Sequence, residues 1–292
     1  MKIRVPASSA NIGPGFDCYG IAWQLYNELD FELRDRGLSI TGCENRYCNR
    51  DNLAYTAYKS VLERCGIKPV GLHIHFGKAD IPVSRGLGSS SALLVGGVMA
   101  ANELHSLGLS RNELLDIATA LEGHPDNVVP ALMGGLSASA LVAGKPVSVR
   151  YPLSDKLRFT ALIPPFELPT AKARGVLPHY IPREDAIFNV SRGALLLSAL
   201  GSGDAKLLRV AMDDRIHEPY RIPLIKGFDI ARGLAYKCGA ASICISGAGS
   251  TLLCVSDKED FADKVAADLG GVLPDWQVLP LEVEQNGAYI VE

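Results

Sequence analysis

The sequence has no apolar run of about 18 residues, the length that a membrane-spanning helix requires, so no membrane association is expected. It also lacks a strong charge of either sign. The net charge is -3, and the lysines and arginines are scattered rather than gathered in a stripe, so no nucleic-acid partner is expected. Residues 1–6 have the pattern of a short strand, not that of a secretory signal peptide.

The sequence also lacks cysteine pairs at the spacings of Cys-x-x-Cys or zinc-binding motifs. The seven cysteines include no Cys-x-x-Cys pair, and Cys43 and Cys48 have no second pair at a zinc-type spacing. An odd number of scattered cysteines is typical of reduced thiols in the cytosol. We therefore expect a cytoplasmic protein whose 292 residues suffice for two domains, each with its own core.

What the sequence does contain is a glycine- and serine-rich loop between a strand-like segment at 71–76 and an apolar, proline-free segment at 92–104. A small-residue loop that opens a helix presents unpaired N–H groups and the positive end of the helix dipole, which together bind phosphate. The loop lacks the Gly-Lys-Ser/Thr ending of a Walker A motif, and such loops can also serve only to turn the chain. The candidate nucleotide-binding residues here are Pro82, Val83, Ser84, Arg85, Gly86, Leu87, Gly88, Ser89, Ser90, Ser91 and Ala92.

Two further loops favour the phosphate-binding interpretation. Residues 6–17 read Pro-Ala-Ser-Ser-Ala-Asn-Ile-Gly-Pro-Gly-Phe-Asp, and residues 246–251 read Ser-Gly-Ala-Gly-Ser-Thr between two apolar runs. In order and spacing, the three loops resemble the motifs of the GHMP kinase superfamily across nearly the whole chain. The segments 9–17, 85–91, 122–131 and 218–221 are most similar to its homoserine kinase branch. Two residues depart mildly from the usual motifs of the family: Ser250 stands where the family more often has proline, and Ser8 stands where it commonly has threonine.

The order of predicted elements indicates an α+β protein. We predict strands at 2–7, 20–33, 72–77, 136–142, 157–164, 242–246, 251–256 and 276–281, and helices at 92–104, 111–122, 188–200, 205–212, 224–238 and 260–269. Ser110 and Glu113 have the spacing of a capping box at the start of one helix. A composition break near residue 150 suggests two domains, 1–150 and 151–292. The resemblance implies the two-domain GHMP kinase fold, with a nucleotide-binding, ribosomal protein S5-like first domain and a ferredoxin-like second domain.

The resemblance also implies ATP and Mg²⁺. The main-chain amides of residues 86–91 would cradle the triphosphate, and a hydroxyl of Ser89 or Ser90 with the carboxylate of Glu122 would complete a magnesium site. Taken alone, Glu122 is an ordinary solvated carboxylate at a helix end, but its place in the motif favours the metal. Asn52 is predicted to contact the adenine.

The implied acceptor is L-homoserine, a small zwitterion with a terminal hydroxyl. Arginine suits its carboxylate because the guanidinium can donate two parallel hydrogen bonds, and Arg174 and Arg221 match the positions that bind it. The other substrate-binding candidates are Asn11, Asp17, His124, Asn127, Thr170 and Gly247. Of these, Asn11 and Asp17 are candidates for the ammonium group, and Thr170 approaches the hydroxyl end.

The catalytic candidates His124, Asp126 and Asn127 follow one another in a short loop. Some members of the superfamily use an aspartate to take the acceptor proton, whereas homoserine kinases are thought to work without a strong base. The adjacent Asp126 and Asn127 leave both arrangements open, and we favour Asn127 facing the acceptor.

Two other functions remain in view. The chain could be a GHMP kinase for another small alcohol, such as mevalonate or a sugar, since mevalonate also carries a carboxylate. It could also be a non-catalytic nucleotide-binding protein of the same fold, although Glu122 and the serine run are retained. A homodimer is common in the family, and the sequence leaves the oligomeric state open.

Overall fold

The computed structural model describes residues 1–291, and within them the strands form two sheets. The strands of the first are β1 Lys2–Asn11, β2 Gly15–Arg34, β3 Leu38–Thr41, β4 Gly71–Ala79, β5 Leu136–Val142, β6 Lys145–Tyr151 and β11 Tyr289–Val291. Their order is β11-β1-β2-β4-β3, with β5 paired to β2 and β6 to β5. Neighbouring strands are antiparallel except β3 and β4. Residues 12–14 therefore join two paired strands at one end of this sheet, and the rest of the predicted loop 6–17 belongs to β1 and β2.

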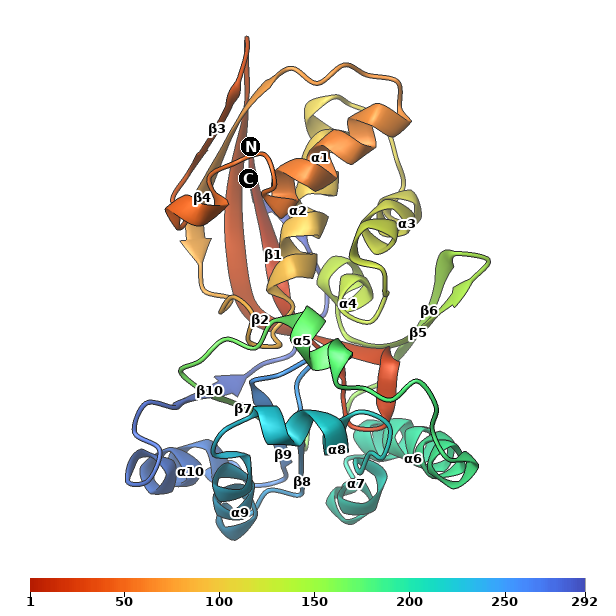
Figure 1. The fold of residues 1–292 in the computed structure, drawn as a ribbon, viewed down its shortest axis with the longest axis vertical. Helices are drawn as coiled ribbons and strands as arrows, with labels where there is room; N and C mark the ends of the chain where they lie inside the picture. The colour runs from red at the N-terminus through yellow and green to blue at the C-terminus, as the bar shows by residue number, and fades with distance from the viewer. Residues whose placement is uncertain (292) are drawn as a thin grey trace.

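Helices α1 Leu53–Arg64, α2 Ser89–Leu104, α3 Arg111–Glu122 and α4 Val128–Met133 lie on one face of this sheet (Figure 1). Helix α2 is buried along most of its length and contacts α1, α3 and β1. At Gly97, a Cβ atom would lie 2.1 Å from the carbonyl oxygen of Ala54, so α1 and α2 can pack this closely only over a glycine. The packing fixes the direction of α2 and points its amino terminus toward the second half of the chain (Figure 1).

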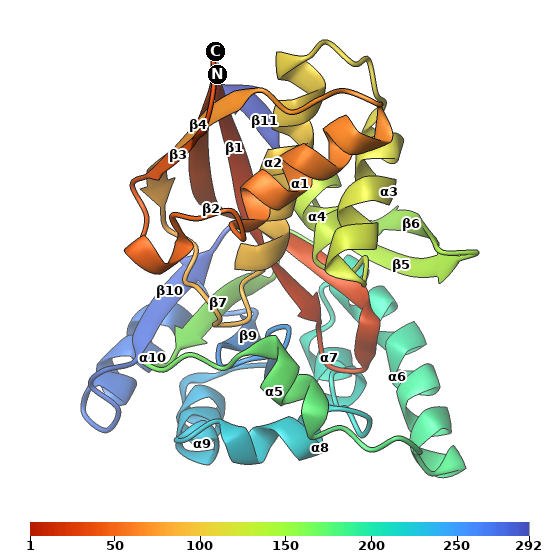
Figure 2. The same ribbon diagram turned by 45° about the horizontal axis from the view of Figure 1, so that its top comes forward.

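The second sheet contains β7 Arg158–Ile163, β8 Ser242–Ile245, β9 Leu252–Ser256 and β10 Gln277–Leu281 in the order β10-β7-β9-β8, all antiparallel. With helices between β7 and β8 and between β9 and β10, this is the split β-α-β arrangement of ferredoxin-like domains. The accompanying helices are α5 Thr170–Gly175, α6 Arg183–Ser202, α7 Ala205–Ala211, α8 Glu218–Arg221, α9 Phe228–Cys238 and α10 Phe261–Gly270, and the short 3₁₀ helices are η1 Asn45–Tyr47 and η2 Ile222–Leu224. Figure 2 shows α5 next to α8, on the side of α8 toward α2.

The two units share a hydrophobic core. Trp23 of β2 and Phe159 of β7 belong to one buried cluster, and their ring centroids are 5.1 Å apart. The larger hydrophobic cluster thus spans both units, and the expectation that each unit has its own core is wrong for it. A second, smaller cluster lies within the second unit, where α9 and α10 pack on the opposite face of the second sheet. We retain the division into 1–150 and 151–292 as a proposal, noting that β11 crosses it to pair with β1.

Most predicted elements are confirmed, with shifted ends. The helix predicted at 111–122 is α3, and Ser110 and Glu113 form the expected capping box. The helix predicted from 92 begins earlier, at Ser89, so all three serines belong to its first turn. Strands β3, β6 and β11 and helices α1, α4, α5 and α8 were not predicted. Within residues 1–291, no helix combines the length and the apolar character that crossing a bilayer requires.

Candidate functional site

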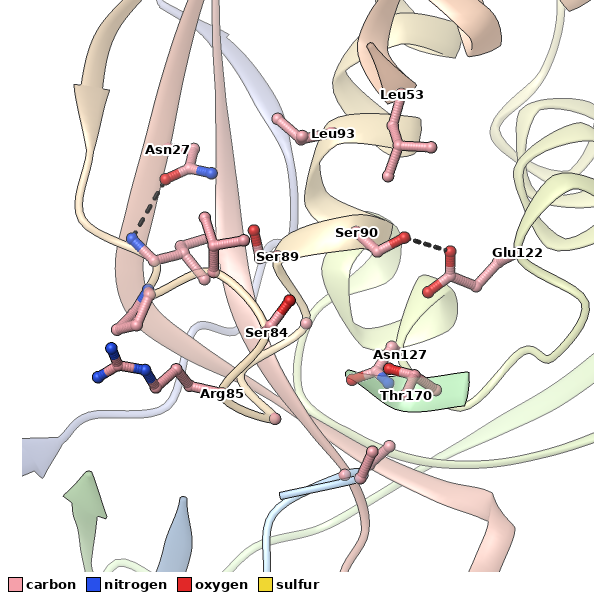
Figure 3. A pocket seen from close by; sticks show the side chains of 18 of the residues that line it. Asn27, Leu53, Ser84, Arg85, Ser89, Ser90, Leu93, Glu122, Asn127 and Thr170 are labelled. Atoms are coloured by element: carbon pink, nitrogen blue, oxygen red, sulfur yellow. Dashed lines mark hydrogen bonds between the residues drawn. The ribbon is translucent and has the colours of Figure 1, made fainter. Parts of the chain in front are cut away.

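A cavity of about 660 Å³ lies between the two units, within the size range of small-molecule sites. Its walls come from the β1–β2 loop, the loop before α2, the end of α3, helices α5 and α8, and the β8–β9 loop. Figure 3 shows the side chains of Ser89, Ser90 and Glu122 at this cavity. The three loops singled out in the sequence thus meet at one place.

Main-chain hydrogen bonds hold the three loops together. The N–H of Ser8 donates to the Leu87 carbonyl at 3.1 Å, and the N–H of Gly247 donates to the Ala10 carbonyl at 3.0 Å. The N–H of Thr251 donates to the Arg85 carbonyl at 3.1 Å. Because these hydrogen bonds join main-chain atoms, they position the loops relative to one another independently of side-chain identity.

The amino terminus of α2 opens into the cavity. Gly88, its N-cap residue, has a φ of 71°, and Gly86 has a φ of 77°, a region that favours glycine. A Cβ atom at Gly88 would lie 2.1 Å from the Ser8 hydroxyl, and one at Gly86 would lie 2.1 Å from the Ser246 carbonyl oxygen. The first N–H groups of a helix have no partner within it, so this end of α2 can bind an anion.

Hydroxyl and carboxylate oxygens gather beside this helix end. Ser90 donates a hydrogen bond of 2.8 Å to one oxygen of Glu122, and Ser91 donates one of 2.7 Å to the other (Figure 3 shows the first). Glu122 is the last residue of α3 and is followed by Gly123, whose φ of 91° turns the chain away. Ser89 lines the cavity but makes no hydrogen bond to Glu122 among the described residues. Ser90 and Glu122 are thus the pair of hard oxygen donors suited to a small divalent cation.

Opposite charges pair at the other end of the cavity. Arg174 of α5 donates two hydrogen bonds to Asp17, at 2.7 and 3.1 Å, and these bonds raise the pKa of Arg174. The N–H of Asp17 donates to the side-chain oxygen of Asn11 at 3.0 Å, while the Asn11 amide donates to the Gly247 carbonyl at 2.7 Å. Both Asn11 and Asp17 have positive φ, 69° and 55°, which these residue types tolerate better than most.

Arg221 of α8 lies almost fully buried at the cavity wall, with 1% of its surface exposed. Its Nε donates to the Ala173 carbonyl at 3.2 Å, and its Nη1 donates to the Gly247 carbonyl at 3.1 Å and to His217 Nδ1 at 3.2 Å. Burial, together with the nearby Arg174, lowers the pKa of Arg221 to about 10, so it remains a cation at neutral pH. Within residues 1–291, Nη2 has no partner and is free to bind an anion.

The catalytic candidates form a small network at the cavity. His124 Nδ1 and Asp126 Oδ1 are 2.5 Å apart, and the same oxygen accepts the N–H of Asn127 at 3.0 Å. Burial alone would lower the pKa of His124, but the hydrogen bond and charge of Asp126 outweigh it, so the pKa is raised. The Ser8 hydroxyl donates to Asn127 Oδ1 at 2.8 Å, which leaves the Asn127 NH₂ group free to act as a donor. Asp17, His124 and Asp126 also bring their ligand atoms within 4.8 Å of one another.

The remaining wall is largely apolar and, apart from Asn52, was not found from the sequence. Its apolar residues come from β4, α1, α2 and the segments that precede these two helices: Tyr47, Leu53, Phe76, Ile81 and Leu93. Asn52 is also part of it, but its amide is already engaged as the N-cap of α1 and with the Tyr47 carbonyl. No sequence motif marks this wall, because ordinary core residue types form it.

Most predicted site residues line the cavity: Asn11, Asn52, Pro82, Val83, Ser84, Arg85, Gly86, Gly88, Ser89, Ser90, Glu122, His124, Asp126, Asn127, Thr170, Arg174, Arg221 and Gly247. Asp17 is not in the wall but pairs with Arg174, which is. Leu87, Ser91 and Ala92 have buried side chains outside the wall, so only their main chain could reach a nucleotide.

A buried carboxyl group binds the backbone at the end of β8, where the β8–β9 loop begins. Glu218 of α8 accepts the N–H of Ile245 at 2.6 Å, and burial raises its pKa to about 8 from an ordinary 4.5. Between about pH 4.5 and 8, Glu218 therefore keeps its proton in the folded state, whereas the same carboxyl group in the unfolded chain has lost it. The free energy of unfolding should accordingly decrease as the pH rises through this window.

We expect Glu218→Gln to reduce that decrease, because glutamine can accept the same N–H without titrating. The measurement is urea denaturation of both proteins at about pH 5 and about pH 9. Glu259→Gln, at a side chain that is 88% exposed, is the matched control. An identical pH dependence in wild type and Glu218→Gln would contradict the assignment.

Comparisons with known proteins agree with the geometry. The model described as "GHMP kinases N terminal domain" matches residues 52–135, and that described as "GHMP kinases C terminal" matches residues 196–275. A homoserine kinase of Clostridium botulinum is 43% identical over 99% of this chain and 98% of its own length. The crystal structure of homoserine kinase from Cytophaga hutchinsonii has a TM-score of 0.89 at 30% identity, covering 100% of this chain and 97% of that one. A putative homoserine kinase from Listeria monocytogenes has a TM-score of 0.82 at 34% identity, with coverages of 100% and 99%.

The relative and the two solved structures match at least 99% of the chain, and together with the two family models they confirm the predicted two-domain GHMP kinase fold. They agree with a cavity in which an anion-binding helix end faces paired arginine and carboxylate groups. The chain belongs to the homoserine kinase family of the GHMP kinases.

Proposed function

We propose that this chain transfers the γ-phosphoryl group of ATP to the side-chain hydroxyl of L-homoserine, giving O-phospho-L-homoserine and ADP in threonine biosynthesis. The observation that carries the proposal is that a single cavity holds both halves of the required chemistry. One end has the amino terminus of α2 for a triphosphate, and the other has groups complementary to an amino-acid zwitterion. Kinases need this arrangement because phosphoryl transfer depends mainly on positioning and charge neutralisation.

The zwitterion end recognises homoserine by charge. We assign the substrate carboxylate to Arg221 Nη2, which has no other partner within residues 1–291, and to Arg174. We assign the ammonium group to Asp17 and Asn11. Because Arg174 and Asp17 are paired with each other, the substrate would replace one ion pair by two, with each of its charges facing its opposite.

The apolar wall and the α2 terminus are assigned to ATP. The adenine would lie against Tyr47, Leu53 and Phe76, near Asn52, with the phosphates at the N–H groups that open α2. Ser90 and Glu122 fit Mg²⁺ because they supply one hydroxyl and one carboxylate oxygen, leaving room for phosphate oxygens and water. When bound, magnesium neutralises charge on the phosphates.

In the transfer step, the homoserine hydroxyl oxygen forms a bond to the γ-phosphorus while the bond to the β,γ-bridging oxygen breaks and ADP departs. The hydroxyl proton leaves late, to an oxygen of the transferred phosphoryl group or to water, so no strong base is required. We assign Asn127 the role of orienting the hydroxyl, because its NH₂ group can donate but cannot take a proton. Thr170 and the His124–Asp126 pair complete the polar surroundings.

The direct test measures ADP release with Mg²⁺ and a panel of L-homoserine, L-threonine, L-serine, mevalonate and galactose. We expect L-homoserine to give the highest kcat/KM. Release that homoserine does not stimulate would overturn the proposal, and preference for mevalonate or galactose would redirect it to another alcohol. A homodimer, from the family resemblance, and a cytoplasmic location, from the cysteine pattern, remain predictions.

A further inference from the structure

His217 is buried beside the substrate end of the cavity, and none of the assigned roles uses it. Its side chain has no exposed surface. One ring nitrogen, Nε2, lies 2.9 Å from the Gly13 carbonyl oxygen, and the other, Nδ1, lies 3.2 Å from Arg221 Nη1. The imidazole thus connects the β1–β2 loop of the first unit to the arginine of the second.

The chemistry of its partners determines its protonation state. A guanidinium can only donate hydrogen bonds, so Nδ1 must accept from Arg221. A carbonyl oxygen can only accept, so Nε2 must carry the proton and donate to Gly13. Burial, the largest influence, lowers the pKa of His217, which agrees with a neutral ring at neutral pH.

The ring is held in place from two further sides. Phe16 stacks on it, with ring centroids 5.2 Å apart and an interplanar angle of 26°. Asp214 accepts the main-chain N–H groups of Ile216, His217 and Glu218 at 2.7 to 3.1 Å, which fixes the backbone at the start of α8. A ring constrained in this way has one orientation, and its hydrogen bond to Arg221 is correspondingly directional.

We propose that His217 is a positioning residue for substrate recognition: by accepting from Nη1, it turns the Arg221 guanidinium so that Nη2 faces the carboxylate of the substrate. This inference rests on the proposed function. Through Gly13 and Phe16 the same ring contacts the loop that carries Asn11 and Asp17. It therefore sets the distance between the groups for the ammonium and for the carboxylate.

Two conservative variants separate the contacts of His217. In His217→Asn, the side-chain oxygen can occupy the position of Nδ1 and still accept from Arg221. In His217→Gln, the amide reaches the position of Nε2 and can donate to Gly13, but Nη1 of Arg221 loses its acceptor. Exposed His179→Gln is the matched control, since it lies outside the cavity wall.

We expect His217→Gln to raise the KM for L-homoserine about tenfold or more, the effect of losing one hydrogen bond to a charged group. The KM for ATP should stay within about twofold, and His217→Asn should restore most of the homoserine affinity. An unchanged homoserine KM in His217→Gln, or an equal rise in both variants, would overturn the inference. If His217→Gln does not fold, a homoserine KM raised tenfold in His217→Asn would also overturn it. A wild type that homoserine does not stimulate would instead refute the proposed function.

Discussion

Replacing Arg221 by leucine should raise the KM for L-homoserine about a hundredfold or more, with a much smaller change in the KM for ATP. The substitution removes the cation assigned to the substrate carboxylate from a site where water cannot take its place, because Arg221 is 1% exposed. It also removes the hydrogen bond of Arg221 to the Ala173 carbonyl and leaves the Gly247 carbonyl with the Asn11 amide as its remaining side-chain donor. Steady-state kinetics with each substrate varied in turn would measure the effect.

Arg221→Lys and Arg36→Leu are the matching comparisons for this prediction. Lysine keeps the charge but cannot reproduce three donor directions, so its homoserine KM should lie between those of wild type and Arg221→Leu. Arg36 is an exposed arginine outside the cavity wall, and its loss should change neither KM. If the homoserine KM of Arg221→Leu equals that of wild type, Arg221 does not bind the substrate.

Glu122→Gln should lower kcat about a hundredfold and increase the Mg²⁺ concentration needed for half-maximal rate. The carboxylate is assigned to the metal together with Ser90, and an amide is a far poorer ligand for a hard cation. Glutamine has the same size and can still accept from Ser90 or Ser91, so the fold should be preserved. A magnesium titration of the initial rate at saturating ATP and homoserine would measure both effects.

Ser90→Ala provides a second variant for the metal assignment, since it removes the hydroxyl ligand and keeps the carboxylate. It should shift the magnesium titration in the same direction by a smaller amount, because the remaining carboxylate carries the charge. Glu259→Gln, at an exposed glutamate, should leave the titration unchanged. If the magnesium titrations of Glu122→Gln and Ser90→Ala both match that of wild type, Glu122 does not bind the metal and is only a carboxylate at a helix end.

The fold was predictable where local patterns are strong. The capping box at Ser110, the 3.6-residue period of α3 and the turn residues between β8 and β9 depend on neighbours in sequence. Strand β6 was missed because it is an edge strand, exposed along almost its whole length, and so lacks an alternation of buried and exposed residues. Helix α1 was missed although Ala54, Ala57, Tyr58, Val61 and Leu62 do form a buried stripe.

The residues of the candidate site likewise divide into those that the sequence predicts and those that it does not. Some of its predicted residues, such as Gly86 and Gly88, stand in a loop whose backbone conformation and crowding leave no room for a side chain. The apolar wall of the cavity and His217 carry no such mark. Buried aromatic, aliphatic and histidine residues are common in any core, so their place in the site depends on contacts between distant segments.

By itself, the sequence determined the chemistry available to this protein: an unpaired row of amides at a helix start, hydroxyls and a carboxylate beside it, and arginines in two later segments. These properties are local, because backbone conformation and side-chain type depend on a few consecutive residues. Only the tertiary structure decided which of these groups meet. Packing of α2 against α1 and the backbone contacts among the three loops bring Arg221 to Gly247 and His217 to Gly13, across 26 and 204 residues of chain.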